Sequence, residues 1–570
     1  MTTIEQTHYE RSLRAGPRVL AKGAKRTKGR ATWKHNITVA TLMAEMLQTT
    51  LGPKGMHKVL TDMLDTLVIS GDGVTILRKF ETDNPAAKII VEMAKAIDAE
   101  VGDGVTTAVV LAGALLDNAV KLFHERIHPS IIISGYKKAL SHALDILKSQ
   151  SISVDYRDKA VLRSVARTSL DKQLLWSGAE HLANLAAEAA IKVVNAKDGA
   201  KRLEPSEDIQ IVVKTGGTVL DSVLIDGIIV ERQLKHPTLP RRVEDARIAL
   251  VDKSIRIEKT KNWSELRINS PALMRGFVEE ESRMLEEMVE RISSAGANVV
   301  FCQKGIDDRA LYFFGRRGIM AVREVHRRDF EMLAKATHAR IAVSAWEITP
   351  EHLGYARLVE ERDIGAETWV FVEGCEKPGA VSIMLRGGIY KWVEEIKDRV
   401  KDALRNIATI VEESRIVAGG GAAEVAAARS LRRYALTLKS KEQMAVNAFA
   451  DALERIPRIL AQNAGLDAIS IISDIRHAQE NNGVSYGVDV RDGKVKDMLS
   501  AGIVDPLKVR ETAWKAAVEI ACTILRIDEV VWAAKRPWHE RPKMTEKSVE
   551  WSRQGFIGQP GSYPMYGEPY

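Results

Sequence analysis

Cysteine is scarce in this chain of 570 residues, which has three, Cys302, Cys375 and Cys522. They lie far apart in the sequence, and no two of them form a CxxC pair. Structural zinc sites and disulfide frameworks use closely spaced or paired cysteines, so the sequence argues against both. Aromatic residues make up only 5% of the chain, and we therefore expect a core built mainly from aliphatic side chains.

Long apolar runs are missing as well. No segment approaches the ~18 consecutive apolar residues of a membrane-spanning helix, and the opening MTTIEQTHYERSLRAG lacks the apolar core of a signal peptide. These absences predict a cytoplasmic protein with no membrane span. A content of 45% hydrophobic and 28% charged residues is typical of globular proteins. A chain of this length is expected to form about two to four domains.

Charge is only slightly unbalanced, at a formal net value of +7. Part of the excess lies in RVLAKGAKRTKGRATWKH near the start, which suits either a mobile basic arm or a nucleic-acid-binding segment. No nucleic-acid-binding motif accompanies it, so we predict no specific nucleic-acid partner. At the other end, KRPWHERPKM and GQPGSYPMYGEPY are rich in Pro, Gly and Tyr and predict a disordered tail over residues 536–570.

The pentapeptide GDGVT is present twice, at residues 71–75 and 102–106. β-Branched residues on both sides of the first copy predict a hairpin that turns at Gly-Asp-Gly. The second copy follows a helix whose start is marked by Asn84 and Pro85, and it leads directly into the apolar segment TTAVVLAGALLDNAVKLF. The sequence therefore places the second copy at the N-terminus of a buried helix.

The pattern changes along the chain. A helix is predicted over residues 37–51 and should stop at Gly52 and Pro53. From VLIDGIIVERQL to ETWVFVEGC, strands and helices alternate as in an α/β domain, and SPALMRGFVEEESRMLEEMVERISSAG within that part predicts a long charged helix. Another long helix should begin near Tyr390. Its apolar face is predicted to comprise Trp392, Ile396, Val400, Leu404, Ile407 and Val411.

The second GDGVT offers phosphate chemistry. A helix N-terminus presents unpaired N–H groups and a positive dipole end, which suit phosphate oxygens. Thr106 and Thr107 add hydroxyls, and Asp103 could hold a Mg²⁺ ion that bridges phosphates. A loop capped by a threonine would explain the same residues without any ligand.

Other candidate residues can also be explained without any role in ligand binding. Three glycines in AGGGA at residues 418–422 suit close approach of a ligand, but they also suit a flexible hinge. Taken alone, Asp402 and Lys172 are typical surface charges. The sequence contains no Walker A motif, and it lacks HExxH, GxSxG and the kinase motif set.

The order of these segments resembles a group II chaperonin, the family of the archaeal thermosome and the eukaryotic cytosolic chaperonin. The resemblance covers about residues 20 to 535. The segments that carry it are TTLGPKGMHKVL, ISGDGVTIL, VGDGVTTAVVLAGALL, KTGG, ANVVFCQKGIDD, MLRGG, AGGGAAE, NAGLDAISII and ILRIDEVV.

The resemblance implies a multi-domain α+β fold. A mostly helical equatorial ATPase domain would comprise residues 1–155 and 413–535, and a small intermediate hinge domain residues 156–222 and 375–412. An α/β apical domain, residues 223–374, would bind clients and carry a helical lid protrusion at about 255–290. The Gly216-Gly217 pair would lie where the chain passes from intermediate to apical domain.

The resemblance also implies an ATP and Mg²⁺ site. Asp103 would bind the metal, while Asp72 and Asp402 would position and polarise the attacking water. The phosphates would be held by Thr50, Leu51, Gly52, Pro53, Gly102, Gly104, Thr106, Thr107 and Lys172. The adenosine would be surrounded by Gly421, Val490, Ile503 and Asp505. The two GDGVT copies would thus converge on one nucleotide.

Three residues depart from the family's usual pattern. Val105 replaces a threonine of the usual GDGTT, Gly71 replaces an asparagine, and Ala418 replaces the proline of the more usual PGGGA, which is a minor change. Since Thr106 and Thr107 remain, nucleotide binding is expected to survive, while Gly71 bears on local rigidity and rate.

The apical segment implies two contact surfaces. The lid tip would expose Trp263, Leu266 and Ile268, although ordinary core packing would also explain them. Client proteins would bind the helix in GIDDRALYFFGRRG, where some of the side chains must belong to the core. The candidates there are Leu311, Tyr312, Phe313 and Phe314.

The function implied is that of an ATP-hydrolysing molecular chaperone subunit. It would assemble with identical or paralogous subunits into a double ring and enclose unfolded proteins by ATP-driven lid closure. One alternative is a structural subunit of a mixed ring that binds nucleotide but hydrolyses it weakly or not at all. A small-molecule kinase is a second alternative, against which the missing kinase motifs argue.

Overall fold

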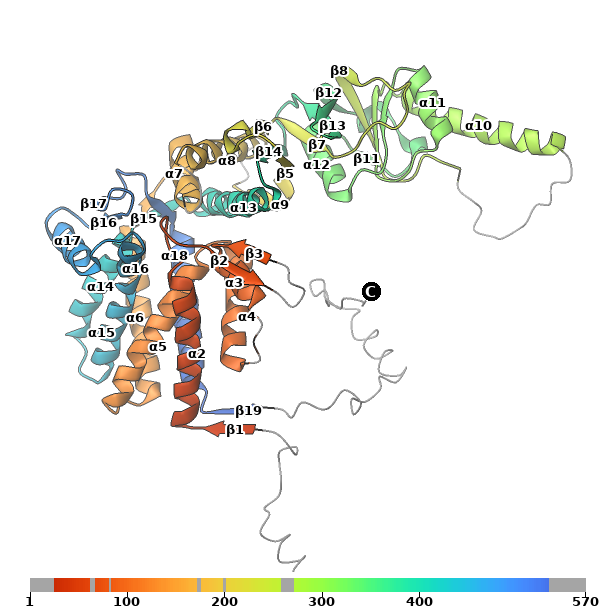
Figure 1. Cartoon of the computed structure of the whole chain (residues 1–570). Coiled ribbons are helices and arrows are strands. Elements are labelled where there is room, and N and C mark those ends of the chain that lie inside the picture. Colours follow the sequence, from red (N-terminus) through yellow and green to blue (C-terminus); the bar gives the residue numbers. More distant parts are fainter. Residues whose placement is uncertain are drawn as a thin grey trace, which may run out of the picture. The chain divides into compact units, whose positions relative to one another are not determined.

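The computed structural model describes residues 25–61, 67–80, 82, 84–171, 176–197, 201–257 and 271–532 (Figure 1). The chain divides into two compact units, of which one is residues 35–526 and the other is made of the segments on either side. The fold is mixed α+β with several separate sheets. Of the basic stretch at residues 18–35, residues 18–24 lie outside the described residues, as do the tip residues Trp263, Leu266 and Ile268 and the predicted tail at 536–570. The rest of that stretch forms strand β1 (Lys25–Lys28) and begins helix α2 (Arg30–Gln48), so the interpretation as a mobile arm is wrong for this part.

A helical body is built from segments far apart in the sequence. Helices that precede residue 151 pack against helices that follow residue 421, as in the pairs α5–α18 and α6–α15. Its centre is α5, most of which is buried, and Tyr136 donates its hydroxyl hydrogen to the Leu115 carbonyl at 2.7 Å inside this body. The helices are α2 (Arg30–Gln48), α3 (Gly73–Lys79), α4 (Pro85–Glu100), α5 (Val105–His124), α6 (Pro129–Gln150), α14 (Ala422–Ala435), α15 (Glu442–Leu453), α16 (Arg455–Asn463), α17 (Ala468–Asn481) and α18 (Leu507–Arg526).

Helix α5 is also long and apolar enough to cross a membrane by length and composition. It is the one such helix in the part of the chain that the structure describes, and 72% of its apolar window is buried inside the protein. Burial of this kind is what a core helix of a folded body shows.

A seven-stranded mixed sheet lies in the middle of the sequence. Its strands run in the order β10-β9-β8-β12-β13-β7, and β11 pairs with β8. The short strands β7, β9 and β10 are buried at every residue, as expected for strands covered on both faces. The strands are β7 (Gly227–Val230), β8 (Arg242–Val251), β9 (Val299–Cys302), β10 (Met320–Val322), β11 (Ile341–Ala342), β12 (Gly354–Ile364) and β13 (Glu367–Glu373).

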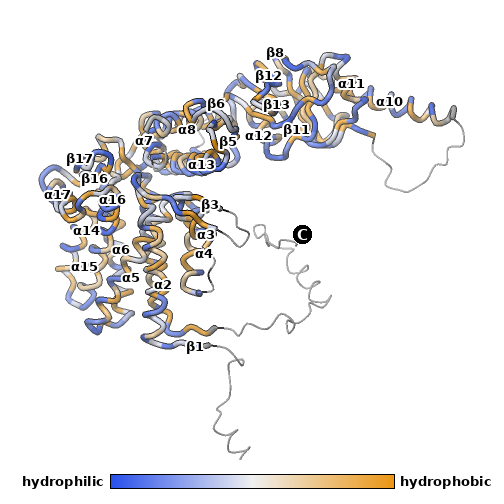
Figure 2. Tube along the Cα trace, in the orientation of Figure 1, coloured by the Kyte–Doolittle hydropathy of each residue, from blue (hydrophilic) through white to orange (hydrophobic). Residues whose placement is uncertain are grey.

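Three helices belong to this sheet's part of the chain. Helices α11 (Asp308–Arg316) and α12 (Arg327–Thr337) contribute Leu311, Phe314 and Phe330 to the same core. The predicted charged helix is α10 (Pro271–Ser294), along which hydrophobic and hydrophilic residues alternate (Figure 2). Its last turns reach the core through Leu285, Val289 and Ile292, while Met274 and Phe277 near its start are exposed.

A smaller three-stranded sheet lies in a part of the chain whose described residues also form four helices. Strand β14 (Val381–Gly387) lies between β5 (Ile209–Thr215) and β6 (Val223–Ile225). The predicted long helix is α13 (Tyr390–Glu413), and its expected apolar face is buried except for the partly buried Trp392. The remaining helices here are α7 (Lys159–Leu170), α8 (Trp176–Ala196) and the short α9 (Pro205–Asp208).

Short strands and turns complete the described elements. The strand pairs and triplets are β2 (Lys58–Thr61) with β3 (Leu67–Ser70), β16 (Tyr486–Asp489) with β17 (Lys494–Asp497), β15 (Arg415–Ala418) between β18 (Val504–Pro506) and β4 (Ile152–Ser153), and β1 (Lys25–Lys28) with β19 (Glu529–Trp532). The 3₁₀ turns are η1 (Val219–Asp221), η2 (Ala345–Glu347) and η3 (Pro350–His352). In the unit formed by the chain's flanking segments, β1 pairs antiparallel with β19.

The prediction of a hairpin turning at the first GDGVT is wrong. The hairpin is formed earlier, by β2 and β3, and residues 73–79 form helix α3. The Asp72 carboxylate caps that helix by accepting hydrogen bonds from the N–H and the hydroxyl of Thr75, both at 2.9 Å. The cap and the burial of Val74, Ile76 and Leu77 outweigh the β preference of Val and Ile. Both GDGVT copies therefore precede helices.

Candidate functional site

A pocket lies where several loops of the unit 35–526 meet, and its free volume, open mouth included, is about 1040 Å³. Nine of the residues predicted to bind nucleotide or metal line it: Leu51, Gly52, Pro53, Asp103, Gly104, Thr107, Val490, Ile503 and Asp505. They come from four separate stretches of sequence, so the fold brings together what the sequence keeps apart.

The N-terminus of α5 forms one wall of the pocket. Gly104 is the N-cap of this helix with φ of +85°, a left-handed conformation that glycine adopts without strain. Its side-chain-free backbone leaves the first N–H groups of the helix without a side-chain cap. Thr106 and Thr107 are both buried in the first turn, and Thr107 lines the pocket. Such an arrangement suits phosphate oxygens.

Asp103 is held beside that helix end by two hydrogen bonds. Its Oδ1 accepts from the Gly104 N–H at 2.6 Å, and its Oδ2 accepts from the Asn406 side-chain amide of α13 at 2.8 Å. Both bonds fix the carboxylate of this residue, which lines the pocket and retains further lone pairs as acceptors. No group of three potential His, Cys, Asp or Glu ligands is found among the described residues.

The loop after α2 forms a second wall. Gly52 has φ of +82°, and a Cβ there would lie 2.4 Å from the Leu460 side chain. The Asn463 side-chain amide donates to the carbonyls of Gln48 and Leu51, each at 2.9 Å, and so fixes the loop. Thr50 is buried and does not line the pocket, and its hydroxyl donates to the Leu47 carbonyl at 2.8 Å.

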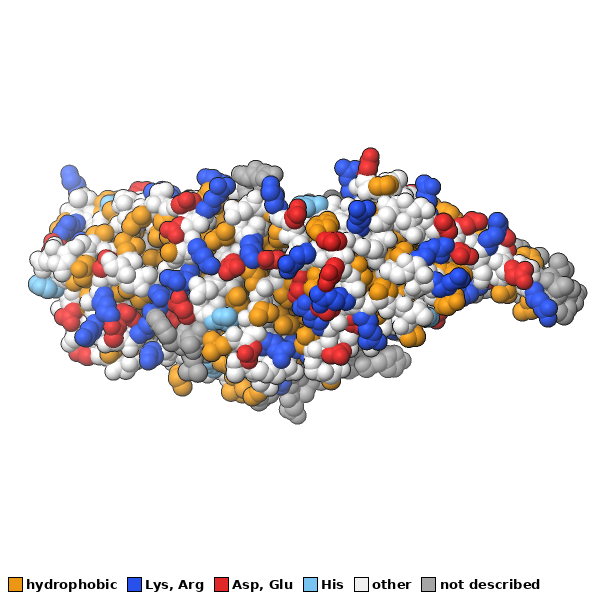
Figure 3. Space-filling model, turned by 90° about the horizontal axis from the view of Figure 1, so that it is seen from above, with side chains coloured by type: hydrophobic (Ala, Val, Ile, Leu, Met, Phe, Trp, Pro, Cys, Tyr) orange, Lys and Arg blue, Asp and Glu red, His pale blue; other side chains and the backbone are white. Residues whose placement is uncertain are grey.

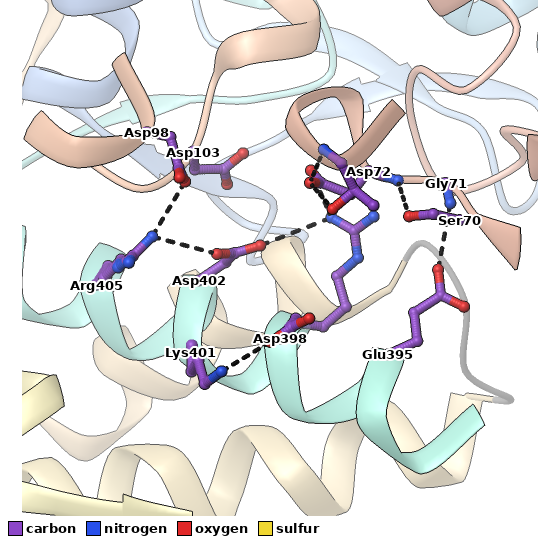
Figure 4. A network of polar contacts seen from close by, with 12 residues as sticks. Ser70, Gly71, Asp72, Asp98, Asp103, Glu395, Asp398, Lys401, Asp402 and Arg405 are labelled. Carbon is purple, nitrogen blue, oxygen red and sulfur yellow. Dashed lines mark hydrogen bonds and ion pairs between the residues drawn. The ribbon is translucent and has the colours of Figure 1, made fainter. Parts of the chain in front are cut away.

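Asp72 and Asp402 meet across two elements. Arg399 Nη1 lies 3.7 Å from Asp72 Oδ1 and 3.8 Å from Asp402 Oδ2, and Arg405 Nη1 lies 3.8 Å from Asp402 Oδ1. Figure 4 shows Asp402 and Arg405 reaching from α13 towards Asp72, Asp98 and Asp103 on the facing segments. The side chain of Asp402 is only 20% exposed, so its interpretation as an ordinary surface charge is wrong.

The electrostatics of Asp402 are unusual. Burial, followed by the nearby Asp72 carboxylate, raises its pKa well above the ordinary value, and Arg399 and Arg405 oppose that rise. Neither Asp72 nor Asp402 lines the pocket itself, whereas Arg399 does. The two carboxylates therefore lie behind an arginine that faces the pocket.

The opposite side of the pocket is formed by β16, the loop before β18 and the glycine turn before α14. Gly420 lines this side of the pocket. Gly421 is the N-cap of α14, and it lies so close to Pro457 that an added Cβ would be 2.4 Å from the proline side chain. Asp505 accepts a hydrogen bond from Arg510 Nε at 3.0 Å, and Arg510 also donates to the buried Glu424 at 2.8 Å. Arg510 thus links Asp505 on this side of the pocket to Glu424 in helix α14.

Several predicted residues lie beside the pocket and not in its lining. Gly102 approaches α13 closely, since a Cβ there would lie 2.1 Å from the Arg405 side chain. Thr106 packs against α3, where a Cβ on Gly73 would lie 2.5 Å from its hydroxyl oxygen. Lys172 lies outside the described residues, although Thr168, Ser169 and Asp171 just before it line the pocket.

Sequence reasoning missed several charged residues of the pocket. Arg399, Asp489, Arg491 and Arg510 line it, as does Asp171, which forms an ion pair with Arg491. Burial raises the pKa of Asp171, and Arg491 works against that rise. A helical pattern could have placed Arg399 one turn before Asp402, but the other partners are distant in sequence.

Comparison with known proteins shows the family of this chain. Residues 43–535 match the model of the TCP-1/cpn60 chaperonin family. Thermosome subunit alpha of Archaeoglobus fulgidus is 44% identical over 515 residues, 90% of this chain and 94% of the relative. Thermosome subunit beta of Thermococcus kodakarensis is 45% identical over 517 residues, 91% and 94% of the two chains. A thermosome subunit of Pyrococcus horikoshii is 44% identical over 529 residues, 93% and 96%.

The chain belongs to the TCP-1/cpn60 chaperonin family, and the predicted resemblance is confirmed. It is a group II chaperonin subunit, an ATP-dependent and ATP-hydrolysing folding protein, as its family match and its thermosome relatives establish.

Proposed function

We propose that this chain hydrolyses ATP in the pocket between the loop after α2, the N-terminus of α5 and the turn before α14. The observation that carries the proposal is the meeting of Asp72, from the cap of α3, with Asp402, from α13, around one arginine that lines this pocket. Two carboxylates from distant segments, held next to a phosphate-binding helix end, are what water activation beside a nucleotide requires.

The phosphates would lie against the N–H groups at the start of α5 and the backbone of residues 51–53. Asp103 suits Mg²⁺, because this ion is usually bound by one or two carboxylates together with substrate phosphates. A Mg²⁺ ion bound there would neutralise phosphate charge. Gly420, Val490, Ile503 and Asp505 would surround the adenosine, with Gly421 shaping the turn behind them.

Asp72 and Asp402 would orient the attacking water and accept its proton. Phosphoryl transfer needs positioning and charge stabilisation more than covalent catalysis. Since Asp402 is carried by α13 and not by the helical body, hydrolysis would require α13 to be docked as it is here. ATP turnover would thus depend on the position of an element outside the nucleotide-binding body.

The domain assignment follows the same division. We propose residues 1–155 and 413–535 as the equatorial domain, 156–222 and 375–412 as the intermediate domain, and 223–374 as the apical domain with its lid at about 255–290. Gly216 and Gly217, with φ of +102° and +77°, directly follow β5 and would serve as the hinge. We further propose a cytoplasmic double ring of identical or paralogous subunits that encloses unfolded proteins.

Client contacts would use the exposed side of α11. Of the four side chains considered there, Leu311 and Phe314 are buried in the core, whereas Tyr312 is 45% exposed and Phe313 is partly buried. Tyr312 and Phe313 are therefore the two that remain for clients. Basic and acidic side chains are interspersed on the face drawn in Figure 3, an arrangement that does not favour nucleic acid.

The test is steady-state phosphate release from ATP and Mg²⁺ by the assembled protein and its Asp402→Ala variant. Asp398→Ala is the matched control, since Asp398 lies one turn earlier on α13 and is 67% exposed. We expect turnover to collapse only in Asp402→Ala. Equal turnover in all three proteins would contradict the site assignment. Absence of turnover in the unmodified protein, with nucleotide still bound, would favour the structural subunit of a mixed ring.

A further inference from the structure

Arg399 lies between the pocket and the two hydrolytic carboxylates. Its side chain is only 8% exposed, it extends from α13, and it lines the pocket together with Asp103, Gly104 and Thr107. Burying a charged guanidinium costs free energy of folding unless its N–H groups form hydrogen bonds.

Its donors are not fully used. The distances of 3.7 Å to Asp72 and 3.8 Å to Asp402 are ion-pair distances and too long for hydrogen bonds. Its Nη2 atom is buried, and no hydrogen-bond partner for it is found among the described residues. A guanidinium has five N–H donors, so this one retains hydrogen-bonding capacity at a pocket wall.

Other arginines around the site differ from Arg399. Arg510 is occupied by hydrogen bonds to Asp505 and Glu424 at 3.0 and 2.8 Å. Arg405 is 42% exposed, pairs with Asp98 at 3.1 Å and does not line the pocket. Arg399 therefore combines burial, a place in the pocket lining and an unused donor.

We propose that Arg399 is a further catalytic residue, which donates its free Nη2 hydrogens to the terminal phosphate of bound ATP. This inference rests on the proposed function of the pocket. The ion pairs with Asp72 and Asp402 orient the planar guanidinium, and an arginine suits this task because its charge is permanent and its donors form a rigid fork.

ATP hydrolysis in this pocket would require no proton transfer from Arg399. The oxygen of water forms a bond to the γ-phosphorus, and the bond from that phosphorus to the β–γ bridging oxygen breaks. The products are ADP and inorganic phosphate, and the proton released by water passes to one of the two carboxylates. Arg399 stabilises the negative charge on the γ-phosphoryl oxygens as these bonds exchange.

The experiment uses the assembled protein and three variants, Arg399→Ala, Arg399→Lys and Lys401→Ala. Lys401 is the matched control, because it is a cation on the same helix whose partner is the exposed Asp398. For each protein we would measure kcat and KM for ATP and the dissociation constants of ADP and of ADP with aluminium fluoride, a mimic of the transferring phosphoryl group. Thermal unfolding and size-exclusion chromatography would report folding and assembly.

We expect Arg399→Ala to lower kcat roughly 10³-fold, the lower end of the range for an arginine that stabilises phosphoryl transfer. ADP affinity should change less than about threefold, while the tighter binding of ADP with aluminium fluoride should be lost, since that complex gains from transition-state contacts. Arg399→Lys should retain the charge but not the fork, and should lose about tenfold in kcat. Lys401→Ala should behave as the unmodified protein.

Two outcomes would overturn the inference. One is unchanged or increased turnover in Arg399→Ala, which would mean that Arg399 only neutralises Asp72 and Asp402. The other is an equal weakening of ADP and of its aluminium fluoride complex, which would indicate ground-state binding alone. If Arg399→Ala does not assemble, Arg399→Lys decides by the same two comparisons. Asp402→Ala separates the hypotheses, because normal turnover there would contradict the proposed function itself.

Discussion

The backbone N–H of Gly71 donates to Glu395 Oε1 at 3.2 Å. Glu395 lies on α13, two turns before Asp402, and Gly71 directly precedes Asp72. One hydrogen bond therefore ties the peptide beside Asp72 to the helix that carries Asp402. His57 Nε2 also lies 3.8 Å from the same carboxylate oxygen. Both contacts hold the two halves of the site at a fixed spacing.

Glu395→Ala should slow ATP turnover by roughly ten- to 150-fold, because a hydrogen bond to a charged group is worth about 1.5–3 kcal/mol. Glu395→Gln retains an acceptor oxygen and should lose less. Phosphate release at saturating ATP measures both effects. Glu394→Ala is the control, since Glu394 pairs with Lys397 on the same helix. Identical rates in all four proteins would show that α13 docks without this bond.

ATP turnover should fall on acidification at a higher pH than an ordinary aspartate would give. Burial, and then the Asp72 carboxylate, raises the pKa of Asp402 well above 3.8. As the pH falls through that raised pKa, the carboxylate takes up a proton and can no longer accept one from water. A pH profile of kcat, with ADP binding measured at each pH, checks this. A profile that stays level down to the range of an exposed aspartate would contradict it.

Asp402→Asn should raise the unfolding temperature at neutral pH although it abolishes turnover. A carboxyl group whose pKa is higher in the folded than in the unfolded state favours folding only while it is protonated. Its charge destabilises the folded state increasingly as the pH rises from the unfolded pKa towards the folded one. The amide has no such charge, so its advantage should grow with pH across that interval. Calorimetry at several pH values measures it, and a constant difference would contradict the explanation.

Capping residues allowed helix α4 to be predicted from the sequence, but not helix α3. Asn84 and Pro85 mark the start of α4, and the Asn84 side chain accepts hydrogen bonds from the N–H groups of Ala86 and Ala87. In α3 the local preference of Val and Ile for strands was misleading, because the Asp72 cap and the burial of one face decide the conformation. Local propensity is a weak guide where tertiary contacts oppose it.

The site was predictable in part for a related reason. A helix N-terminus leaves a local signal, so residues 102–107 are predictable as a phosphate-binding segment, whereas residues 51–53 are locally only a helix stop and enter the predicted site through the family resemblance. The residues that pair with the charged groups of the site left no local signal in the sequence, because they come from distant parts of the chain. Gly71 and Glu395 are 324 residues apart, and Arg510 and Glu424 are 86 apart. Arg399 is recognisable as part of the site only once α13 is placed against Asp72.

Gly420→Ala should weaken nucleotide binding. Gly420 has φ of +58°, and an added Cβ would lie 2.6 Å from Met498 Sδ and 2.7 Å from the Val488 carbonyl oxygen, so the pocket wall must move. Gly465→Ala is the matched control, because its φ of +73° gives similar strain of about 1–2 kcal/mol while nothing lies within 4 Å of the new Cβ. We expect at least about tenfold weaker binding of a fluorescent ATP analogue in Gly420→Ala alone. Equal affinities in the two variants would contradict the assignment of that wall.

The pairing of β1 with β19 has a consequence for the synthesis of the chain on the ribosome. Arg26 and Glu529, which pair in these strands, are separated by 503 residues. At a synthesis rate of ~5–20 residues per second, about 25–100 s pass between the appearance of the first strand and that of its partner. During that time β1 presents unpaired backbone groups that any extended segment nearby could occupy. The nascent chain is thus exposed to strand exchange with its neighbours on the same messenger RNA until β19 has been synthesised.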